Sequence, residues 1–552
     1  MMSTGRFFAE TLQGYGVTHV FIVPAIFHQA MTAIEATNIT RVTTHHEMAA
    51  AYMADGYARA GRKLGICMGQ AVGAGNLAAG LRDAWQACSP VIAVSGGPQP
   101  DSRYRYFYQI VEDFPMFTPV TKMNAMVQRP DRLPDLLRQA FRTATTGTPG
   151  PVHLELPGRL GEQVQAEGDF EVLVEEQFAR FPAYRTAPAS RDVEEAVGLL
   201  ATAERPVIVA GGGITASDAS VELVELAEKL SIPVAVTMNG KENIADDHPL
   251  SVGNVGTYGR RSANQIVAEA DLVFFAGSRA GGLTTNNWTL PRRGTPAIQL
   301  DINAEELGRN YPARVGLYGD AKLGLRQMID ACPRSTARSA WVHHAQEALA
   351  TWRAGLIGAS ASDTIPIRPE RLCKELSEFL PAGAVLVADT GHAAIWTGTM
   401  VGLTKPGQRY IRCAGTLGWG FPAALGAKCA VPDRLVLCFT GDGGLCYHLA
   451  ELETAARAGI NAVIVVNNNG ALQQVRKGID TSYGGKQWGR AEEMWVFRPG
   501  TNYARIAEEM GCLGIRVEQP GQIRAALDTA CAAGRPALID VATDVEATPP
   551  WG

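Results

Sequence analysis

Residues 435–443 read Leu-Val-Leu-Cys-Phe-Thr-Gly-Asp-Gly, and residues 462–470 read Ala-Val-Ile-Val-Val-Asn-Asn-Asn-Gly. Each stretch begins as a continuous apolar run, which is typical of a central strand in a parallel sheet covered on both faces. Residues 447–458 between them have helical spacing of their apolar residues. The sequence therefore predicts a strand–helix–strand unit. Its two polar clusters would lie at the carboxyl ends of parallel strands, where open α/β sheets bind ligands.

One such unit can bring Asp442 and Asn469 side by side, since each follows one of the two predicted strands. A carboxylate, an amide oxygen and a backbone carbonyl are the hard oxygen donors that Mg²⁺ takes, usually with phosphate oxygens completing the shell. Gly441 and Gly443 would let a diphosphate approach the backbone closely. The alternative is an ordinary turn after each strand. The spacing and the strand context favour the metal–diphosphate site.

This pattern of Gly441-Asp442-Gly443 followed by paired asparagines resembles the thiamine-diphosphate motif of the acetolactate synthase and benzoylformate decarboxylase superfamily. The resemblance extends over nearly the whole chain. It implies that Asp442, Asn469 and the carbonyl of Ala471 bind Mg²⁺ and bridge it to the diphosphate of the cofactor. It further implies cofactor contacts from Glu47, His392, Gly415, Leu417, Gly441, Asp442, Gly443, Gly444, Asn469 and Leu472. Leu417 matches the bulky residue that bends the cofactor, and the Gly415 carbonyl matches the group that contacts its aminopyrimidine.

Glu47 closes the segment His45-His46-Glu47 and opens a predicted helix over residues 47–60, whose sequence resembles the first-domain signature of this family. In that family the glutamate hydrogen-bonds the aminopyrimidine and activates the cofactor, which implies a catalytic role for Glu47. A charge-assisted hydrogen bond of this kind is stronger in a desolvated pocket than in water. The alternative is a first-turn helix residue favoured by the helix dipole. Its occurrence together with the distant metal motif favours catalysis.

Three α/β domains, each with a doubly wound parallel sheet, are expected from the length of 552 residues and from alternating strand-like and helix-like segments. By family pattern they are a pyrimidine-binding domain over residues 1–160, a central domain over 190–335 and a diphosphate-binding domain over 366–545. The first and third segments look alike in layout. Residues 161–190 are acidic and then proline-rich, which predicts a surface linker.

Composition indicates an ordinary globular protein, with 46% apolar and 19% charged residues and a net charge of −5. Nothing points to a nucleic-acid partner. Ten cysteines without a CxxC pair favour the reducing cytoplasm, and we expect neither a signal peptide nor a membrane span. The family resemblance implies small-molecule carbonyl substrates. It also implies a homodimer or homotetramer, with the cofactor between the first domain of one subunit and the third domain of another.

Several residues are candidates for the reacting centre by family pattern. Gln109 matches a glutamine near the reacting centre of the synthases, with a structural hydrogen bond as the alternative. Gln70 lies in a glycine-rich turn that faces the cofactor in relatives. His28 could replace a polar group that decarboxylases often place at the position of Ile26, or it could cap a helix. We expect substrate contacts from Ile26, Phe27, Gln474, Val475 and Gly478.

Two glycines depart from the synthases at substrate-channel positions. Gly158 stands where they have a lysine, and Gly478 where they have a tryptophan. Together with the apolar residues Ile26 and Phe27, they predict a pocket suited to a larger and less charged substrate.

The central domain retains Gly253–Gly259 and Asp301-Ile302-Asn303, as in flavin-containing synthases, but residues 277–282 depart from their flavin-contact pattern. The glycine triplet 211–213 is by itself a weak nucleotide signal. Structural FAD is therefore allowed but not favoured. The first expectation is acetolactate synthase-like carboligation. The alternatives are an aldehyde, acyloin or dione lyase or hydrolase, a 2-oxo acid decarboxylase, and a non-catalytic cofactor-binding paralogue.

Overall fold

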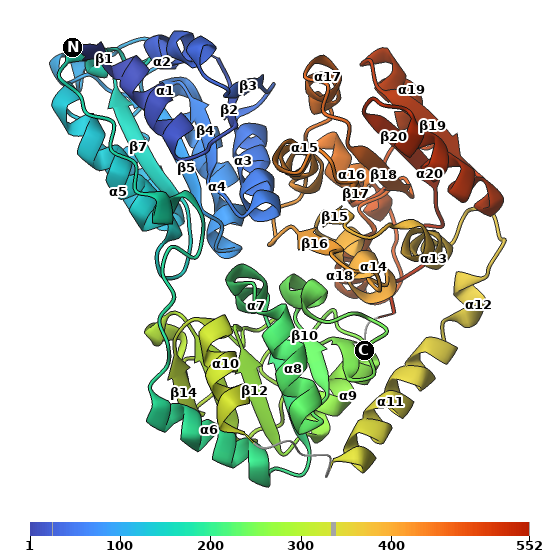
Figure 1. Ribbon diagram of the computed structural model, residues 1–552. Helices are drawn as coiled ribbons and strands as arrows, with labels where there is room; N and C mark the ends of the chain where they lie inside the picture. Colours follow the sequence, from blue (N-terminus) through green and yellow to red (C-terminus); the bar gives the residue numbers. More distant parts are fainter. Residues whose placement is uncertain (25, 333–337, 551–552) are drawn as a thin grey trace.

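Three six-stranded sheets, all parallel, form the framework of the computed structural model, which describes residues 1–24, 26–332 and 338–550 (Figure 1). The expected α/β class with three parallel-sheet domains is confirmed. Each sheet lies inside one of the three expected segments. The exact domain boundaries stay a prediction, and the one placed at residue 335 lies outside the described residues. Among those residues, no helix combines the length and the apolar character needed to cross a bilayer.

The first domain carries the sheet β3-β2-β4-β5-β7-β6. Its strands are β2 (His19–Ile22), β3 (Thr40–Thr43), β4 (Gly65–Gly69), β5 (Val91–Gly97), β6 (Met123–Met126) and β7 (Val152–Pro157). Its helices are α1 (Thr4–Gly14), α2 (His28–Ala33), α3 (Glu47–Gly61), α4 (Ala74–Gln86) and α5 (Leu133–Thr145). A short antiparallel pair, β1 (Met2–Ser3) and β8 (Glu167–Gly168), ties the first linker to the start of the chain.

The third domain repeats this topology with the sheet β16-β15-β17-β18-β20-β19. Numbered within each domain, both sheets have the order 2-1-3-4-6-5, so the expected likeness of layout is confirmed. The strands are β15 (Val385–Ala388), β16 (Arg409–Arg412), β17 (Val436–Gly441), β18 (Val463–Asn468), β19 (Leu513–Val517) and β20 (Ala537–Ala542). The helices are α13 (Pro369–Phe379), α14 (His392–Met400), α15 (Gly420–Ala430), α16 (Asp442–Cys446), α17 (Glu451–Arg457), α18 (Gln473–Ser482), α19 (Tyr503–Glu509) and α20 (Ile523–Ala532).

The central domain has a different sheet, β11-β10-β9-β12-β13-β14. Its internal order, 3-2-1-4-5-6, is that of doubly wound dinucleotide-binding folds. The strands are β9 (Pro206–Ala210), β10 (Val234–Val236), β11 (Ser251–Asn254), β12 (Leu272–Ala276), β13 (Ala297–Asp301) and β14 (Ala313–Tyr318). The helices are α6 (Ser190–Thr202), α7 (Gly212–Ser217), α8 (Ser220–Leu230), α9 (Arg261–Glu269) and α10 (Ala321–Ala331), and α11 (Ser339–Ala354) and α12 (Ile357–Ser360) lead onward to the third domain.

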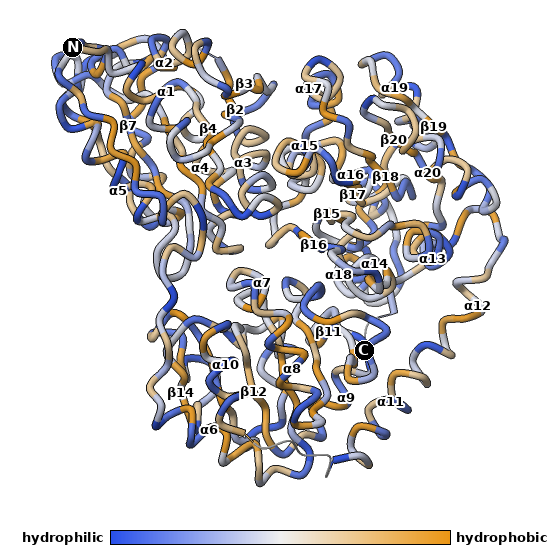
Figure 2. The backbone as a smooth tube through the Cα atoms, viewed as in Figure 1, coloured by the Kyte–Doolittle hydropathy of each residue, from blue (hydrophilic) through white to orange (hydrophobic). Residues whose placement is uncertain are grey.

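A continuous hydrophobic core joins the first and third domains through α3 and α15. The two helices approach so closely that a Cβ on Gly56 would lie 2.0 Å from the carbonyl oxygen of Ala423, and one on Gly426 would lie 1.9 Å from that of Met53. Glycine is required at both positions. Figure 2 shows apolar residues concentrated along the strands of the sheets, as expected where helices cover both faces.

The prediction of a single helix over residues 447–458 is wrong at its start, where the structure has a turn. The structure has two short helices, α16 and α17, with a turn at residues 447–450. Hydrogen bonds of the i→i+3 type run through this turn, from Tyr447 N to Gly444 O (3.3 Å) and from His448 N to Leu445 O (3.2 Å). The turn brings the buried His448 ring edge-on against Tyr52 of α3. A contact with a distant domain therefore overrides the local helical periodicity.

Candidate active site

Asp442 lies at the start of α16, directly after β17, and only 2% of it is exposed. Its Oδ1 accepts a hydrogen bond from Gly443 N (2.9 Å) and its Oδ2 accepts one from Ala471 N (3.1 Å). Burial raises the pKa of this carboxyl to about 6. Because β17 and β18 are neighbours, with Gly441 opposite Asn467, the structure brings the predicted metal ligands to one edge of the sheet.

Gln473 connects two of the predicted cofactor residues. Its Oε1 lies 2.9 Å from Nδ1 of His392 and accepts a hydrogen bond from Nδ2 of Asn469 (3.3 Å). Its own amide nitrogen donates to the carbonyl of Ala547 (2.7 Å), so Gln473 is fixed from both ends. The sequence named its neighbours Leu472 and Gln474 but missed Gln473. Its place in the sequence, four residues after Asn469, was the one feature that could have pointed to it.

Asp389 is a second residue that the sequence analysis did not single out. Its buried carboxylate accepts hydrogen bonds from the backbone N–H groups of Thr390 (2.7 Å), Gly418 (3.1 Å) and Gly420 (3.2 Å). Burial raises its pKa to about 6. One carboxylate thus ties the end of β15 to the loop that carries Leu417, and a Cβ on Gly444 would lie 2.9 Å from its Oδ2.

The residues around Asp442 fit a bound Mg²⁺ and diphosphate. A Cβ on Gly441 or Gly470 would meet no described heavy atom within 4 Å, which leaves room beside the backbone. The buried Oδ1 of Asn467 has no hydrogen-bond partner in the described ranges. These ranges contain no group of three or more His, Cys, Asp and Glu side chains able to hold a metal. The carboxylate, amide and carbonyl of Asp442, Asn469 and Ala471 are instead oxygen donors of the kind that Mg²⁺ shares with phosphates, and they would be the residues to hold it.

Glu47 occupies the first turn of α3 at the carboxyl edge of the first-domain sheet, and it is 9% exposed. Its Oε2 accepts a hydrogen bond from Nδ2 of Asn76 on α4 (3.1 Å). On the other side it lies against two glycines. A Cβ on Gly69 would come within 3.1 Å of the Glu47 Cγ, and a Cβ on Gly73 would come within 2.1 Å of its Oε1. The carboxylate is therefore held in a fixed position by its neighbours.

The other candidates of the first domain lie on loops at the same edge. Gln70 follows β4 directly. Gln109 accepts a hydrogen bond (3.2 Å) from Nη1 of Arg159, which lies two residues after the end of β7. His28 is exposed at the start of α2. Gln70 and Gln109 are half-buried, so their side chains are partly accessible in the single chain.

The structure contradicts the prediction that Ile26 and Phe27 form an apolar substrate wall. Both side chains are fully buried in the core of the first domain, and the Phe27 ring packs against Phe8 with centroids 5.4 Å apart. Gly158 does not open space either. Its φ is +100°, and a Cβ there would lie 2.3 Å from Glu162 Oε2, so backbone conformation and packing require this glycine.

On α18 the predicted substrate residues remain accessible. Val475 is 47% exposed, and a Cβ on Gly478 would meet nothing within 4 Å among the described residues. Gln474 donates from Nε2 to the hydroxyl of Tyr258 in the central domain (3.1 Å), and its Oε1 lies close to Gly391. Substrate contacts from this helix stay a prediction.

The loop with Gly415 and Leu417 is anchored to the first domain of the same chain. Asp83 of α4 accepts hydrogen bonds from the backbone N–H groups of Ala414 (2.9 Å) and Gly415 (3.1 Å). No hydrogen bond among the described residues joins Glu47 to the Asp442 group. We call these two groups the half-sites, one at the carboxyl edge of the first-domain sheet and one at that of the third-domain sheet.

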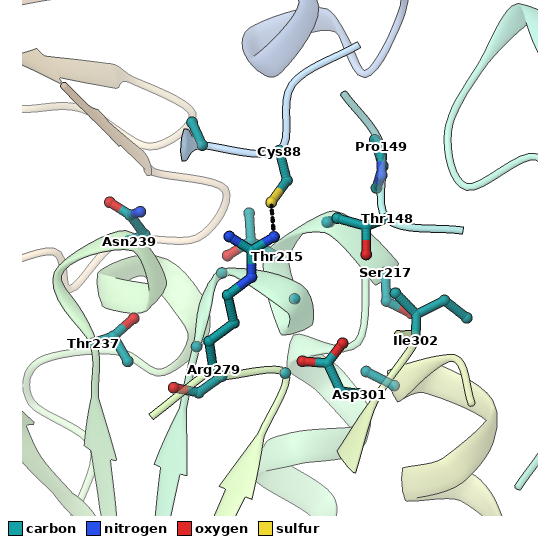
Figure 3. Close-up of a pocket in the computed structure, with 18 of the residues that line it drawn as sticks. Cys88, Thr148, Pro149, Thr215, Ser217, Thr237, Asn239, Arg279, Asp301 and Ile302 are labelled. Carbon is teal, nitrogen blue, oxygen red and sulfur yellow. Dashed lines mark hydrogen bonds between the residues drawn. The ribbon is translucent and has the colours of Figure 1, made fainter. Parts of the chain in front are cut away.

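A separate cavity of about 580 Å³ lies where the three domains meet (Figure 3). The Arg279 side chain extends towards the first domain, and its Nη2 donates to Cys88 Sγ (3.0 Å). The glycine triplet borders this cavity, but a Cβ on Gly211 would lie 2.2 Å from Gly277 O. Close packing of two loops therefore explains that glycine, whether or not a nucleotide binds.

Comparison with known proteins agrees with this architecture. The N-terminal TPP binding domain of the thiamine pyrophosphate enzymes matches residues 2–116, their central domain matches 193–328, and their C-terminal TPP binding domain matches 389–541. The chain is 32% identical to the probable acetolactate synthase large subunit of Methanococcus aeolicus, over 93% of this chain and 87% of that protein. The corresponding protein of Methanocaldococcus jannaschii is 32% identical, over 98% and 92%. Glyoxylate carboligase of Escherichia coli is 30% identical, over 94% and 88%.

Proposed function

The chain belongs to the thiamine pyrophosphate enzyme family, and on that premise we propose that it is a carboligase dependent on thiamine diphosphate and Mg²⁺. Its substrates would be 2-oxo acids or related ketones, as the names of the acetolactate synthase and glyoxylate carboligase relatives indicate for those proteins. One observation carries the proposal. The chain has a fixed, buried Glu47, and it brings the buried Asp442 carboxylate against Ala471, next to the proposed oxygen donors of the 469–471 segment.

Each half-site has a distinct task in this proposal. Asp442, Asn469 and the Ala471 carbonyl would hold Mg²⁺ against the diphosphate, and His392 and Gln473 would flank it. Thiamine diphosphate, when bound, supplies a nucleophilic carbon and an electron sink for chemistry next to a carbonyl. Glu47 would share a proton with the aminopyrimidine, and its burial strengthens that charge-assisted hydrogen bond. Asn76 and Gly73 fix the carboxylate before any ligand binds.

A homodimer or homotetramer would complete the site by joining the first domain of one subunit to the third domain of another. Within one chain no hydrogen bond among the described residues joins the two half-sites, which supports this arrangement. So does the loop that carries Gln109, where Tyr104, Tyr106, Tyr108 and Val111 are 60–112% exposed. Exposed apolar residues gathered on one loop mark protein interaction sites.

A lyase acting on an acyloin or a dione is the second candidate, and the open space at Gly478 favours it because a larger substrate would fit there. We place the protein in the cytoplasm, since its ten cysteines, all within the described ranges, are unpaired. We do not expect stoichiometric FAD, since residues 277–282 depart from the flavin-contact pattern of the synthases.

Product analysis by mass spectrometry tests the proposal. Purified protein with thiamine diphosphate and Mg²⁺ would be given a panel of 2-oxo acids, acyloins and diones, with the Glu47→Gln variant as the control. A carboligase gives a product longer than either substrate, whereas a lyase gives only cleavage products. If no substrate is consumed in a cofactor-dependent way, although calorimetry shows that the cofactor binds, the catalytic proposal is wrong.

A further inference from the structure

A cavity of about 390 Å³ lies between the central domain, the connecting helices α11 and α12, and helices α13 and α14 of the third domain. Figure 1 shows α11 and α12 running from the central domain to the third domain along this side of the molecule. We call it the junction cavity. Residues of all three parts line it, among them Arg260, Trp352, Arg353, Ile357, Lys374 and Met400.

Positive charge exceeds negative charge around this cavity. The buried Asp246 carboxylate is bound by Nη2 of Arg260 (2.7 Å) and by Nζ of Lys241 (2.8 Å). Arg353 donates from Nη2 to the backbone carbonyl of Asp246 (2.6 Å), so a third cationic side chain contacts this residue. On the rim, Lys374 forms a long ion pair of 3.9 Å with Glu378, which also lines the cavity. The lining cations Arg260, Arg353 and Lys374 therefore outnumber the lining acids Asp246 and Glu378 by one charge, and an anion would offset this excess.

Arg260 is the most deeply buried cation that lines the cavity, with 3% of the residue exposed. Its Nε donates to the carbonyl of Thr399 (2.9 Å), and its guanidinium lies over the ring of Trp352, 4.7 Å from the centroid. Its Nη1 is buried and has no hydrogen-bond partner in the part of the chain that the structure describes. This nitrogen lies beside Gly253, where a Cβ would come within 2.8 Å of it. A buried N–H group without an acceptor is costly, and a ligand oxygen that reached it after a shift of the Arg260 side chain would remove that cost.

The remaining wall is apolar. Trp352, Leu356, Ile357 and Met400 all border the cavity, and Ile357 is 66% exposed at its rim. A ligand of matching chemistry has an anionic head and a small hydrocarbon body. A guanidinium N–H group pairs strongly with a carboxylate oxygen, and the apolar wall would exclude water from a hydrocarbon chain.

We propose that the junction cavity binds a small organic carboxylate with an apolar body. The carboxylate lies between Arg260 and Arg353, and the hydrocarbon body packs against Trp352 and Met400. This site is distinct from the cofactor site and from the cavity of Figure 3.

The position of α14 gives such binding a consequence for the cofactor site, a step that rests on the proposed function. Thr399 and Met400, at the carboxyl end of α14, line the junction cavity. His392, at its other end, contacts Gln473 beside the metal ligands. A ligand that shifts this short helix changes the position of His392. Coupling between two binding sites is reciprocal, so each ligand changes the affinity of the other by the same factor.

Titration calorimetry with hexanoate as the probe tests the site on the full-length protein. We expect saturable binding at one site per chain, with hexanamide bound at least ~10-fold more weakly because it lacks the charge that pairs with the arginines. Arg353→Gln removes a rim cation and Ile357→Glu adds a repelling charge, so each should weaken hexanoate binding by a similar factor. Arg191→Gln, an 88% exposed arginine side chain on α6, is the matched control and should bind normally.

Three outcomes would overturn the assignment: no saturable binding, equal affinity for hexanoate and hexanamide, or unchanged affinity in both cavity variants. Inorganic phosphate that displaces hexanoate with equal affinity would also overturn it, since the apolar wall would then contribute nothing. Unchanged melting temperatures of the variants exclude unfolding as a cause. A second titration measures thiamine diphosphate with and without saturating hexanoate. Failure of the cofactor to bind refutes the proposed function alone, because hexanoate binding is measured independently.

Discussion

The carboxylate of Glu47 occupies the space that a side chain on residue 73 would need, since a Cβ on Gly73 would lie 2.1 Å from Glu47 Oε1. Gly73 has a φ of −93°, a conformation open to any residue, so backbone strain is not the reason for glycine here. Its small size instead lets the carboxylate lie beside the turn after β4. The placement of the proposed catalytic acid thus depends on a residue that carries no functional group.

Gly73→Ala should therefore displace Glu47 and lower turnover while the fold persists. We expect a loss approaching that of Glu47→Gln, which removes one positioned acid–base group and should cost ~10²–10⁴-fold. Turnover and thermal unfolding of both variants provide the measurement. Gly75→Ala, two residues along, is the control, because its Cβ would only make ordinary contact with Met116 at 3.5 Å. Full activity of Gly73→Ala would show that the Glu47 position is not critical.

Asp442→Ala should abolish Mg²⁺-dependent binding of thiamine diphosphate. The substitution removes the only charged member of the proposed donor set, and the backbone N–H groups of Gly443 and Ala471 lose their acceptor. Calorimetry with cofactor and Mg²⁺ measures the effect. Asp433→Ala, in the exposed loop before β17, carries the same chemical change away from the site. Near-normal affinity in the Asp442 variant would remove this residue from the metal site.

Glu155 should make the stability of the first domain depend on pH. The residue is 1% exposed on β7, and its Oε1 has no partner among the described residues. Burial raises its pKa to about 7, with smaller effects from Arg103, which lowers it, and from Glu112 and Asp113, which raise it. The folded state therefore favours the neutral acid, whereas the unfolded carboxyl ionises near its ordinary value of 4.5. Stability falls as pH rises between these values and then levels off.

Glu155→Gln removes this titration, so the melting temperature should change less between pH 5 and pH 8 in the variant than in the natural protein. The shift of about 2.5 pKa units sets an upper bound of ~3 kcal/mol on the effect. Melting curves at both values of pH provide the test. Parallel pH profiles for the two proteins would contradict the assignment.

An absorbance scan of the purified protein tests the expectation about FAD. Oxidised flavin gives a band at roughly 450 nm, and we expect no stoichiometric band. Arg279 is engaged with Cys88 at the border between the first and central domains, and a bulky dinucleotide would compete with that contact. A full flavin complement would overturn this expectation and favour the synthase branch.

The sequence was most informative where the candidate site depends on residues that are close together in the chain. Asp442 and Asn469 each follow an apolar strand, and parallel neighbours place such residues together. Glu47 was likewise marked by the sequence that follows it. The prediction that Ile26 and Phe27 line the substrate pocket was wrong, because the residues next to them in the sequence do not reveal their contacts with Phe8 and the core of the first domain.

Asp389 and Asp83 were missed for a different reason. Both bind backbone N–H groups of a loop distant in sequence, and backbone groups leave no mark in the order of residues. A buried acid at a strand end or on an apolar helix face was their only sign. Gln473 likewise acts by joining His392 to Asn469, which the order of residues alone does not reveal.

Gly478 provides the sharpest test of substrate size. It lies on α18 four residues after Gln474 and three after Val475, so all three share one face of the helix. A Cβ there meets no described atom within 4 Å, and replacing a helical glycine does not weaken the helix. Gly478→Trp should therefore fold normally and fill space beside Gln474.

We predict that the natural protein turns over a bulkier ketone, acyloin or dione faster than pyruvate, and that Gly478→Trp reverses this preference. Because the mechanism is steric exclusion, the variant should raise KM for the large substrate at least ~10-fold, equivalent to ~1.4 kcal/mol. Cofactor affinity should hardly change. Kinetics on both substrates, with Gly478→Ala as the control for loss of glycine, measure the effect. Since Ile26 and Phe27 lie in the core, this face of α18 carries the prediction. Efficient use of pyruvate alone by the natural protein would refute it.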